Sequence, residues 1–187
     1  MLKMADAQLL LVTGSTRRLS TNTAALHTAR ELLDGHATAV YDQLKDLPAF
    51  NPDDDHEPVP PAVRALRALI ADADAVIFCT PEYAGTLPGS FKYLLDWTVG
   101  GGEIYGKPAA WINVAAPGRG DGADAALRVV LGYVGARVLD SSGIRVPVPH
   151  DSVGPDGTIG DPATRASLAE ALARIVAELG PLASEQR

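Results

Sequence analysis

The chain has 187 residues, of which 47% are hydrophobic, and this length and composition predict a single domain spanning residues 1–187 with a substantial core. The formal net charge of -7 at pH 7 argues against non-specific binding to nucleic acid, because phosphate backbones are bound by a surplus of Lys and Arg. Cys79 is the only cysteine, which excludes a disulfide framework and a cysteine-based metal site and favours a reducing, cytoplasmic location.

The first apolar run, Leu9 to Val12, leads directly into Gly14 and two arginines. It is too brief for a signal peptide or a membrane span, so we expect no membrane partner.

Apolar runs alternate with helical periodicity along the chain. Leu26, Ala29 and Leu33 recur at helical spacing, and Asp161 and Pro162 have the residue types that begin a final helix. Five segments have the apolar character of strands: Gln8 to Thr13, Thr38 to Tyr41, Ala75 to Thr80, Ala109 to Val114, and Arg137 to Leu139 or a little beyond. This alternation predicts an α/β fold whose parallel sheet is covered by helices on both faces.

Two segments, 47–61 and 150–162, are rich in Pro, Asp or Gly and are predicted to be surface loops. The acidic run 53–55 is interpreted as part of a solvated loop rather than a cation site. The four histidines have no metal-ligand spacing, so no metal site is expected. They are His27, His36, His56 and His150.

The first loop, Gly14 to Asn22, joins the first strand to a helix and is rich in hydroxyl side chains. A helix N-terminus that follows such a loop offers N–H groups, hydroxyl donors and a favourable dipole to one anion, so the loop predicts a phosphate site. It contains neither the Gly-Lys-Ser/Thr of a nucleoside triphosphate loop nor the Gly-x-Gly-x-x-Gly of a dinucleotide fold. A mononucleotide remains, with FMN as the leading candidate.

Two further loops, 80–89 and 116–122, follow the third and fourth predicted strands. The carboxyl ends of parallel strands share one edge of the sheet, and ligands of open α/β sheets bind there. We expect the first loop to hold the phosphate, and the Gly- and Pro-rich backbone of the other two to approach the flat flavin ring.

The first loop resembles the Gly-Ser-x-Arg-x-x-Ser-x-Asn signature of the NADPH-dependent FMN reductase family, a flavodoxin-like group that includes chromate, quinone and azo-dye reductases. Pro81-Glu82-Tyr83, followed by Pro88-Gly89, Lys92, Asp96 and Trp97, is similar to its second signature. The segment 47–53 also looks like the family's second crossover, and the resemblance covers about Leu9 to Leu139.

This resemblance implies a flavodoxin-like three-layer sandwich with a five-stranded parallel sheet in the order 2-1-3-4-5. It implies FMN and NADPH (or NADH) as cofactors, and a homodimer or homotetramer in which the partner subunit helps to close the flavin site. The expected cofactor-binding residues are Ser15, Arg17, Ser20, Thr21, Asn22, Pro81, Glu82, Tyr83, Ala84, Gly85, Ala116, Pro117, Gly118 and Gly122.

Three positions depart from the family pattern. Ala84 stands where the family usually has Asn, which predicts the loss of one side-chain contact to the cofactor, and Ala116 replaces a usual Ser. Asp121 replaces the first glycine of a Gly-Gly pair. A carboxylate near the flavin is expected to oppose the reduced anionic ring, and so to weaken FMN binding or shift the potential.

The expected function is that of an oxidoreductase in which NADPH or NADH reduces FMN. The flavin then passes electrons, by a ping-pong scheme, to a small-molecule acceptor: a quinone, an azo compound, a metal oxyanion or free flavin. No side chain is expected to act as a catalytic acid or base, because positioning a nicotinamide over the ring suffices. The alternatives are a non-enzymatic electron carrier of the flavodoxin kind and, prompted by Ala84 and Asp121, a domain that has lost its flavin.

Overall fold

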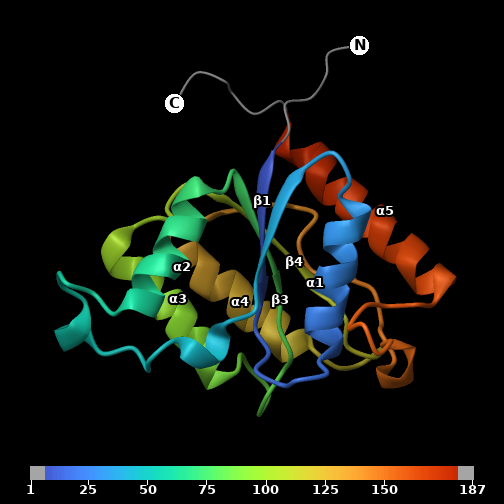
Figure 1. Ribbon diagram of the computed structural model, residues 1–187, viewed down its shortest axis with the longest axis horizontal. Coiled ribbons are helices and arrows are strands. Elements are labelled where there is room, and N and C mark those ends of the chain that lie inside the picture. The colour runs from blue at the N-terminus through green and yellow to red at the C-terminus, as the bar shows by residue number, and fades with distance from the viewer. Residues whose placement is uncertain (1–6, 181–187) are drawn as a thin grey trace.

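The computed structural model describes residues 7–180. Its centre is a sheet in the order β2-β1-β3-β4-β5, in which all pairings are parallel (Figure 1). The strands are β1 (Gln8–Thr13), β2 (Ala37–Tyr41), β3 (Ala75–Cys79), β4 (Pro108–Asn113), β5 (Arg137–Val138) and β6 (Ile144–Arg145). The flavodoxin-like strand order that the resemblance implied is confirmed.

The last strand position differs from the single strand that the sequence predicted. Two short strands occupy it: β5 pairs with the start of β4, and β6 pairs with the end of β4. The residues between them, 139–143, form a turn in which Ser142 N–H donates to the Leu139 carbonyl. The sheet therefore has six strands in five positions, because a local turn interrupts the fifth.

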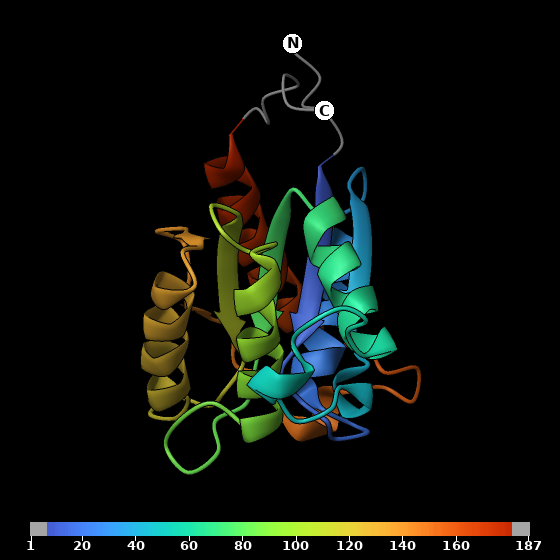
Figure 2. The ribbon, with the colours of Figure 1, turned by 90° about the vertical axis from the view of Figure 1, so that its left-hand side faces the viewer.

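Helices cover both faces of the sheet, as Figures 1 and 2 show. One face carries α1 (Thr21–Leu32) and α5 (Pro162–Leu179), and the other carries α2 (Pro61–Asp72), α3 (Gly89–Gly101) and α4 (Asp121–Tyr133). Each face has its own apolar core, because successive strand residues alternate between the two: Leu9 and Leu11 belong to the first core, Leu10 and Val12 to the second. None of the helices within residues 7–180 has the length and apolar character needed to span a bilayer.

The segment between β2 and α2 makes specific side-chain contacts with α2 and α3. Its short 3-10 helices are η1 (Leu44–Asp46) and η2 (Pro52–Asp54). The fully buried Trp97 of α3 packs edge-on against Phe50, and its indole N–H donates to the Pro48 carbonyl at 3.0 Å. Of the acidic run, Asp53 and Asp54 are exposed as expected, but Asp55 accepts from Arg67 Nη2 at 2.6 Å. The solvated-loop interpretation is therefore wrong for Asp55, because the half-buried guanidinium of Arg67 on α2 pairs with it.

Candidate functional site: a polar cavity at the carboxyl edge of the sheet

The three predicted loops do lie at one edge of the sheet, at the bottom of Figure 1. Segments from all three, together with one residue of the 3-10 helix η3 (His150–Ser152), line a cavity of about 260 Å³. The lining residues are Ser15, Arg17, Ser20, Thr21, Asn22, Thr80, Pro81, Glu82, Tyr83, Val114, Ala115, Arg119, Gly120 and His150.

The first loop brings polar groups to the start of α1. Ser20 is the N-cap of this helix, and its hydroxyl oxygen accepts from the Asn22 N–H at 3.2 Å. Ser15, whose hydroxyl oxygen accepts from the Arg17 N–H at 3.2 Å, lies beside it. The first turn of α1 carries no acidic side chain, so the positive end of the helix dipole is available to an anion.

A contact with β3 orients the side chain of Asn22. The Cys79 thiol donates to Asn22 Oδ1 at 3.3 Å, which leaves the amide N–H groups of Asn22 for other partners. Burial, together with the nearby charge of Asp124, raises the pKa of the Cys79 thiol well above its usual range. Cys79 is therefore a structural thiol that orients Asn22, not a nucleophile.

Two arginines and a histidine line the cavity. Arg17 comes from the first loop, Arg119 from the third, and His150 from η3. Arg17 Nη1 lies 3.3 Å from His150 Nε2, so residues far apart in the chain meet at this cavity. Arg18 is exposed and is not among the lining residues.

The second loop carries a tight turn at its tip. Tyr83 and Thr86 exchange two backbone hydrogen bonds of 3.0 and 3.1 Å, and the residues between them, Ala84 and Gly85, have φ angles of +50° and +75°. Two positive φ values between such a pair define a type I′ turn, which favours Asn-Gly because Asn and Gly tolerate the left-handed backbone. The usual Asn at position 84 therefore suits the turn, and Ala84 is strained there.

Glu82 joins the second loop to the helix that follows the third. Its Oε2 accepts from the N–H groups of Gly122 and Ala123, at 2.7 and 3.1 Å, in the first turn of α4. A Cβ on Gly122 would lie 2.1 Å from the Gly85 carbonyl oxygen. Gly122 thus permits the close approach of the two loops.

The third loop begins at a half-buried polar network. Asn113 Oδ1 accepts from the Ala115 N–H at 2.9 Å, and its Nδ2 donates to Asp124 at 2.7 Å. Trp111 Nε1 donates to the other oxygen of Asp124 at 3.0 Å. Burial raises the pKa of Asp124, although these two hydrogen bonds act in the opposite direction.

The cavity gathers eight of the predicted site residues and leaves six outside its lining. The eight are Ser15, Arg17, Ser20, Thr21, Asn22, Pro81, Glu82 and Tyr83. Ala84, Gly85, Ala116, Pro117 and Gly118 are exposed at the loop tips, and Gly122 packs against the second loop. Contact between any of the fourteen and a cofactor stays a prediction.

The sequence predicted the Asp121 carboxylate near the flavin, and the structure places it against Arg145. It accepts from Arg145 Nη2 and is not among the lining residues. Its charge is therefore paired before it can act on a ligand.

Sequence reasoning missed six lining residues. Thr80, Val114 and Ala115 immediately adjoin the chosen loop positions, and Arg119 and Gly120 belong to the third loop itself. Extending the third loop by two residues would have added Val114 and Ala115, whereas Thr80, Arg119 and Gly120 already lay inside the predicted loops. His150 carried no local signal, because only the fold brings it beside Arg17. Within residues 7–180 no group of three or more potential ligands is placed to hold a metal ion.

Comparison with known proteins now identifies the family. The family model described as NADPH-dependent FMN reductase matches residues 7–148. The chain belongs to the NADPH-dependent FMN reductase family. Its oxidoreductases use FMN together with NADPH, so the family membership agrees with the cofactors that the two signatures implied.

Individual relatives agree with this family. The chain is 35% identical over 113 residues to an NAD(P)H-dependent FMN reductase of Pseudomonas aeruginosa, an alignment that covers 59% of this chain and 61% of the relative. It is 30% identical over 159 residues to a 2-hydroxy-1,4-benzoquinone reductase of Burkholderia sp., covering 83% and 86% of the two chains. The chain thus spans about three fifths of the first relative's length and most of the second's.

A solved structure confirms the fold. The flavoenzyme NAD(P)H:(acceptor) oxidoreductase of Paracoccus denitrificans superposes with a TM-score of 0.79 at 27% sequence identity. The match covers 92% of this chain and 97% of that one.

Proposed function

We propose that the protein is an NAD(P)H-dependent FMN reductase that passes electrons to a small-molecule acceptor by a ping-pong mechanism. The observation that carries the proposal is the convergence, in one cavity, of buried hydroxyl and amide groups with a helix N-terminus whose first turn carries no acidic side chain. The side chains of Ser15, Ser20 and Asn22 are only 5 to 6% exposed, yet they line that cavity. Polar groups buried in this way without a full set of partners suit a charged ligand.

The residues present fit FMN. We assign the phosphate to Ser15, Ser20, Thr21, Asn22 and Arg17, which supply hydroxyl, amide, guanidinium and helix N-terminal donors. The cavity of about 260 Å³ is smaller than the roughly 300–1,000 Å³ that holds a whole cofactor-sized ligand. The ring is therefore assigned to the more open side formed by the second and third loops.

When bound, FMN supplies the hydride and electron chemistry. The protein's part is to bind the phosphate, to hold the ring beside Tyr83 and the third loop, and to leave one side open for the nicotinamide and then for the acceptor. The guanidinium groups of Arg17 and Arg119 also favour anionic nicotinamide nucleotides. A quinone, an azo compound, a metal oxyanion and free flavin are the acceptors we propose, and the Burkholderia relative is itself a quinone reductase by name.

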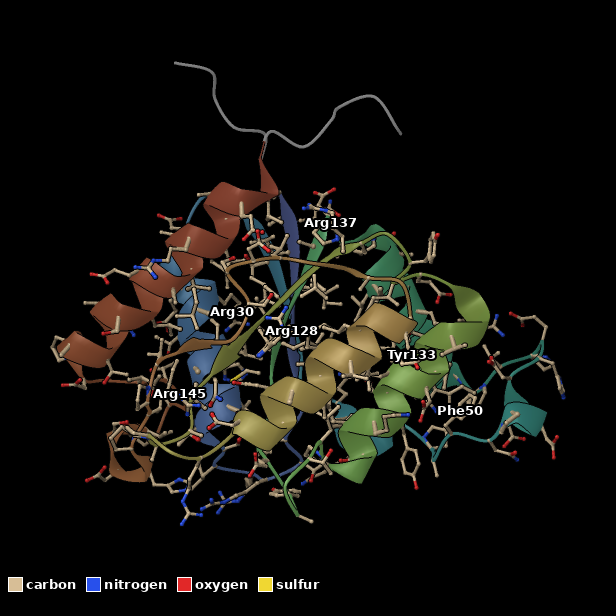
Figure 3. All side chains as sticks on the ribbon, turned by 180° about the vertical axis from the view of Figure 1, so that it is seen from behind. Arg30, Phe50, Arg128, Tyr133, Arg137 and Arg145 are labelled. Atoms are coloured by element: carbon tan, nitrogen blue, oxygen red, sulfur yellow. The ribbon has the colours of Figure 1, made fainter. Side chains whose placement is uncertain are left out.

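We also propose a homodimer or homotetramer in which a second copy covers the open side. The cavity is incomplete for a whole flavin, and large hydrophobic side chains are exposed beside it and on α3 and α4. Tyr83 is 51% exposed, and Tyr133 on α4, labelled in Figure 3, is 90% exposed. A sedimenting mass of two or four chains supports this assembly, and the mass of a single chain contradicts it.

The spectrum of the purified protein tests the function. We expect a yellow protein that NADPH or NADH bleaches in the absence of oxygen, and whose colour a quinone then restores without any partner protein. Initial rates with both substrates varied should give the parallel lines of a ping-pong scheme. A colourless protein that retains no added FMN, or one whose bound flavin ignores both nucleotides, would overturn the assignment.

A further inference from the structure

Arg145 of β6 lies outside the cavity lining but holds the third loop from behind. Its Nη1 donates to the carbonyl oxygens of Ala115 and Ala116, each at 3.3 Å, and to that of Arg119 at 2.5 Å. Its Nη2 donates to Asp121 Oδ1, at the start of α4. One guanidinium thus reaches both ends of the loop.

Arg145 lies there because a turn interrupts the fifth strand position. β6 pairs with the end of β4, so that Arg145 lies beside Asn113, directly before the third loop begins. Figure 3 shows Arg145 toward the carboxyl edge of the sheet and Arg137 of β5 toward the opposite edge. The turn between them is held in place, because the Glu178 carboxylate of α5 accepts from the N–H groups of Asp140 and Ser141 at 2.6 and 2.9 Å.

The direction of these carbonyl groups fixes the direction of the next amides. In a trans peptide unit the C=O and the following N–H point to opposite sides. Because the carbonyls of Ala115 and Arg119 face Arg145, the N–H groups of Ala116 and Gly120 face away from it. The two peptide units that carry these N–H groups, 115–116 and 119–120, include three residues that line the cavity: Ala115, Arg119 and Gly120. Within residues 7–180 neither N–H has a hydrogen-bond acceptor.

We propose that Arg145 is a positioning residue of the cofactor site. Its guanidinium holds the third loop so that the amide N–H groups of Ala116 and Gly120 are presented to the bound FMN, and it neutralises Asp121 at the same edge. The part of this inference that concerns FMN rests on the proposed function, whereas the ordering of the loop does not.

Arg145→Ala and Arg145→Lys test the proposal, with Arg137→Ala as the matched control at the other end of the same strand position. In a titration that follows flavin fluorescence, Arg145→Ala should bind FMN about tenfold more weakly. Arg145→Lys should fall between this variant and the wild type, because one ammonium group cannot reach both ends of the loop. Arg137→Ala should bind as the wild type does. Thermal unfolding confirms that each variant is folded.

Hydrogen exchange on the protein without FMN separates this proposal from the proposed function. The hydrogen-bonded amides of the loop, those of Ala115 and Arg119, should exchange faster in Arg145→Ala and at the wild-type rate in Arg137→Ala. Unchanged exchange in Arg145→Ala would overturn the positioning role, whether or not the wild type binds FMN. A wild type that binds no FMN would overturn the proposed function while leaving the exchange result to decide the role of Arg145 in the loop.

A double variant distinguishes a held loop from simple charge balance. Arg145→Ala leaves the Asp121 carboxylate unpaired, and Asp121→Asn in the same chain removes that charge. If Arg145 acts through the loop carbonyls, the double variant should still bind FMN about as weakly as Arg145→Ala, although its flavin potential returns toward that of the wild type. Recovery of wild-type affinity in the double variant would show that only charge mattered and would overturn the proposal.

Discussion

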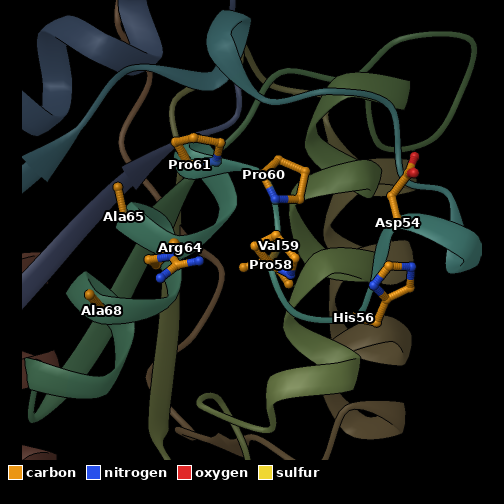
Figure 4. A pocket seen from close by; sticks show the side chains of 9 residues that line it. All are labelled: Asp54, His56, Pro58, Val59, Pro60, Pro61, Arg64, Ala65 and Ala68. Carbon is orange, nitrogen blue, oxygen red and sulfur yellow. The ribbon is translucent and has the colours of Figure 1, made fainter.

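Two hollows on the molecule differ in the way they are built. The larger has a volume of about 700 Å³ and lies along η2 and the start of α2, where its walls come from one continuous stretch of chain, 54–68, with several Pro and Ala residues (Figure 4). The smaller hollow is the cavity of about 260 Å³ described above. Segments from four separate parts of the chain form it at the carboxyl edge of the sheet. Volume alone would select the larger hollow, whereas the residues of both family signatures lie at the smaller one.

The burial of polar groups distinguishes the two hollows. Ser15, Ser20 and Asn22 in the smaller hollow are almost fully buried. In the larger one Arg64 is 60% exposed and forms a surface ion pair with Glu57 at 3.1 Å, which contributes little. The proposed site is thus the hollow in which the fold buries polar groups.

The largest expected effect comes from removing phosphate donors in the smaller hollow. Arg17→Ala combined with Ser20→Ala should weaken FMN binding on the order of 100-fold or more and abolish copurifying flavin, because a charge-assisted and a hydroxyl contact are lost together. Arg64→Ala removes an arginine from the larger hollow and should leave FMN binding unchanged. Stoichiometric yellow flavin in the double variant would contradict the assignment of the phosphate.

The sequence predicted the part of this site that depends on local pattern. The first loop and the end of β1 could be placed because an apolar run, a glycine and several hydroxyl side chains follow one another closely in the chain. The role of the fold in bringing three loops to one edge also followed from the parallel strands.

What the sequence could not predict depends on contacts between distant residues. His150 meets Arg17 across 133 positions of the chain, and Arg145 meets the third loop only because a turn divides the fifth strand position. Asp55 was misjudged for the same reason, since its partner Arg67 lies on the following helix. Residue type and spacing along the chain do not predict such pairings.

A smaller effect is expected from separating the second and third loops. Gly122→Ala places a methyl group against the Gly85 carbonyl and should lower the free energy of unfolding by roughly 1–3 kcal/mol and weaken FMN binding. Gly132→Ala is the matched control on α4, because no atom lies within 4 Å of its added Cβ. It should leave the fold unchanged or stabilise it by up to about 1 kcal/mol. Urea unfolding measures both, and equal stability of the two variants would refute the close contact.

The type I′ turn predicts a modest gain in stability. Ala84→Asn should raise the free energy of unfolding by up to about 1 kcal/mol, because Asn tolerates the left-handed backbone at φ +50° better than Ala does. Ala125→Asn, at an exposed position inside α4, should have the opposite sign, since Asn is a poorer helix former than Ala. A loss of stability in Ala84→Asn would argue against this turn.

The smallest effect concerns Cys79 beneath the smaller hollow. Burial raises the pKa of its thiol well above the usual range, so little thiolate forms at neutral pH. We expect no labelling by iodoacetamide in the folded protein and rapid labelling once denaturant unfolds it. Mass spectrometry measures both states, and fast alkylation of the native protein would contradict the assigned structural role.

The most direct test of the account is a pair of equilibrium titrations of the apoprotein, one with FMN and one with riboflavin, which lacks the phosphate. If the smaller hollow is a phosphate site, FMN should bind with one molecule per chain and on the order of 100-fold more tightly than riboflavin. Equal affinities for the two flavins, or no binding of either, would contradict it.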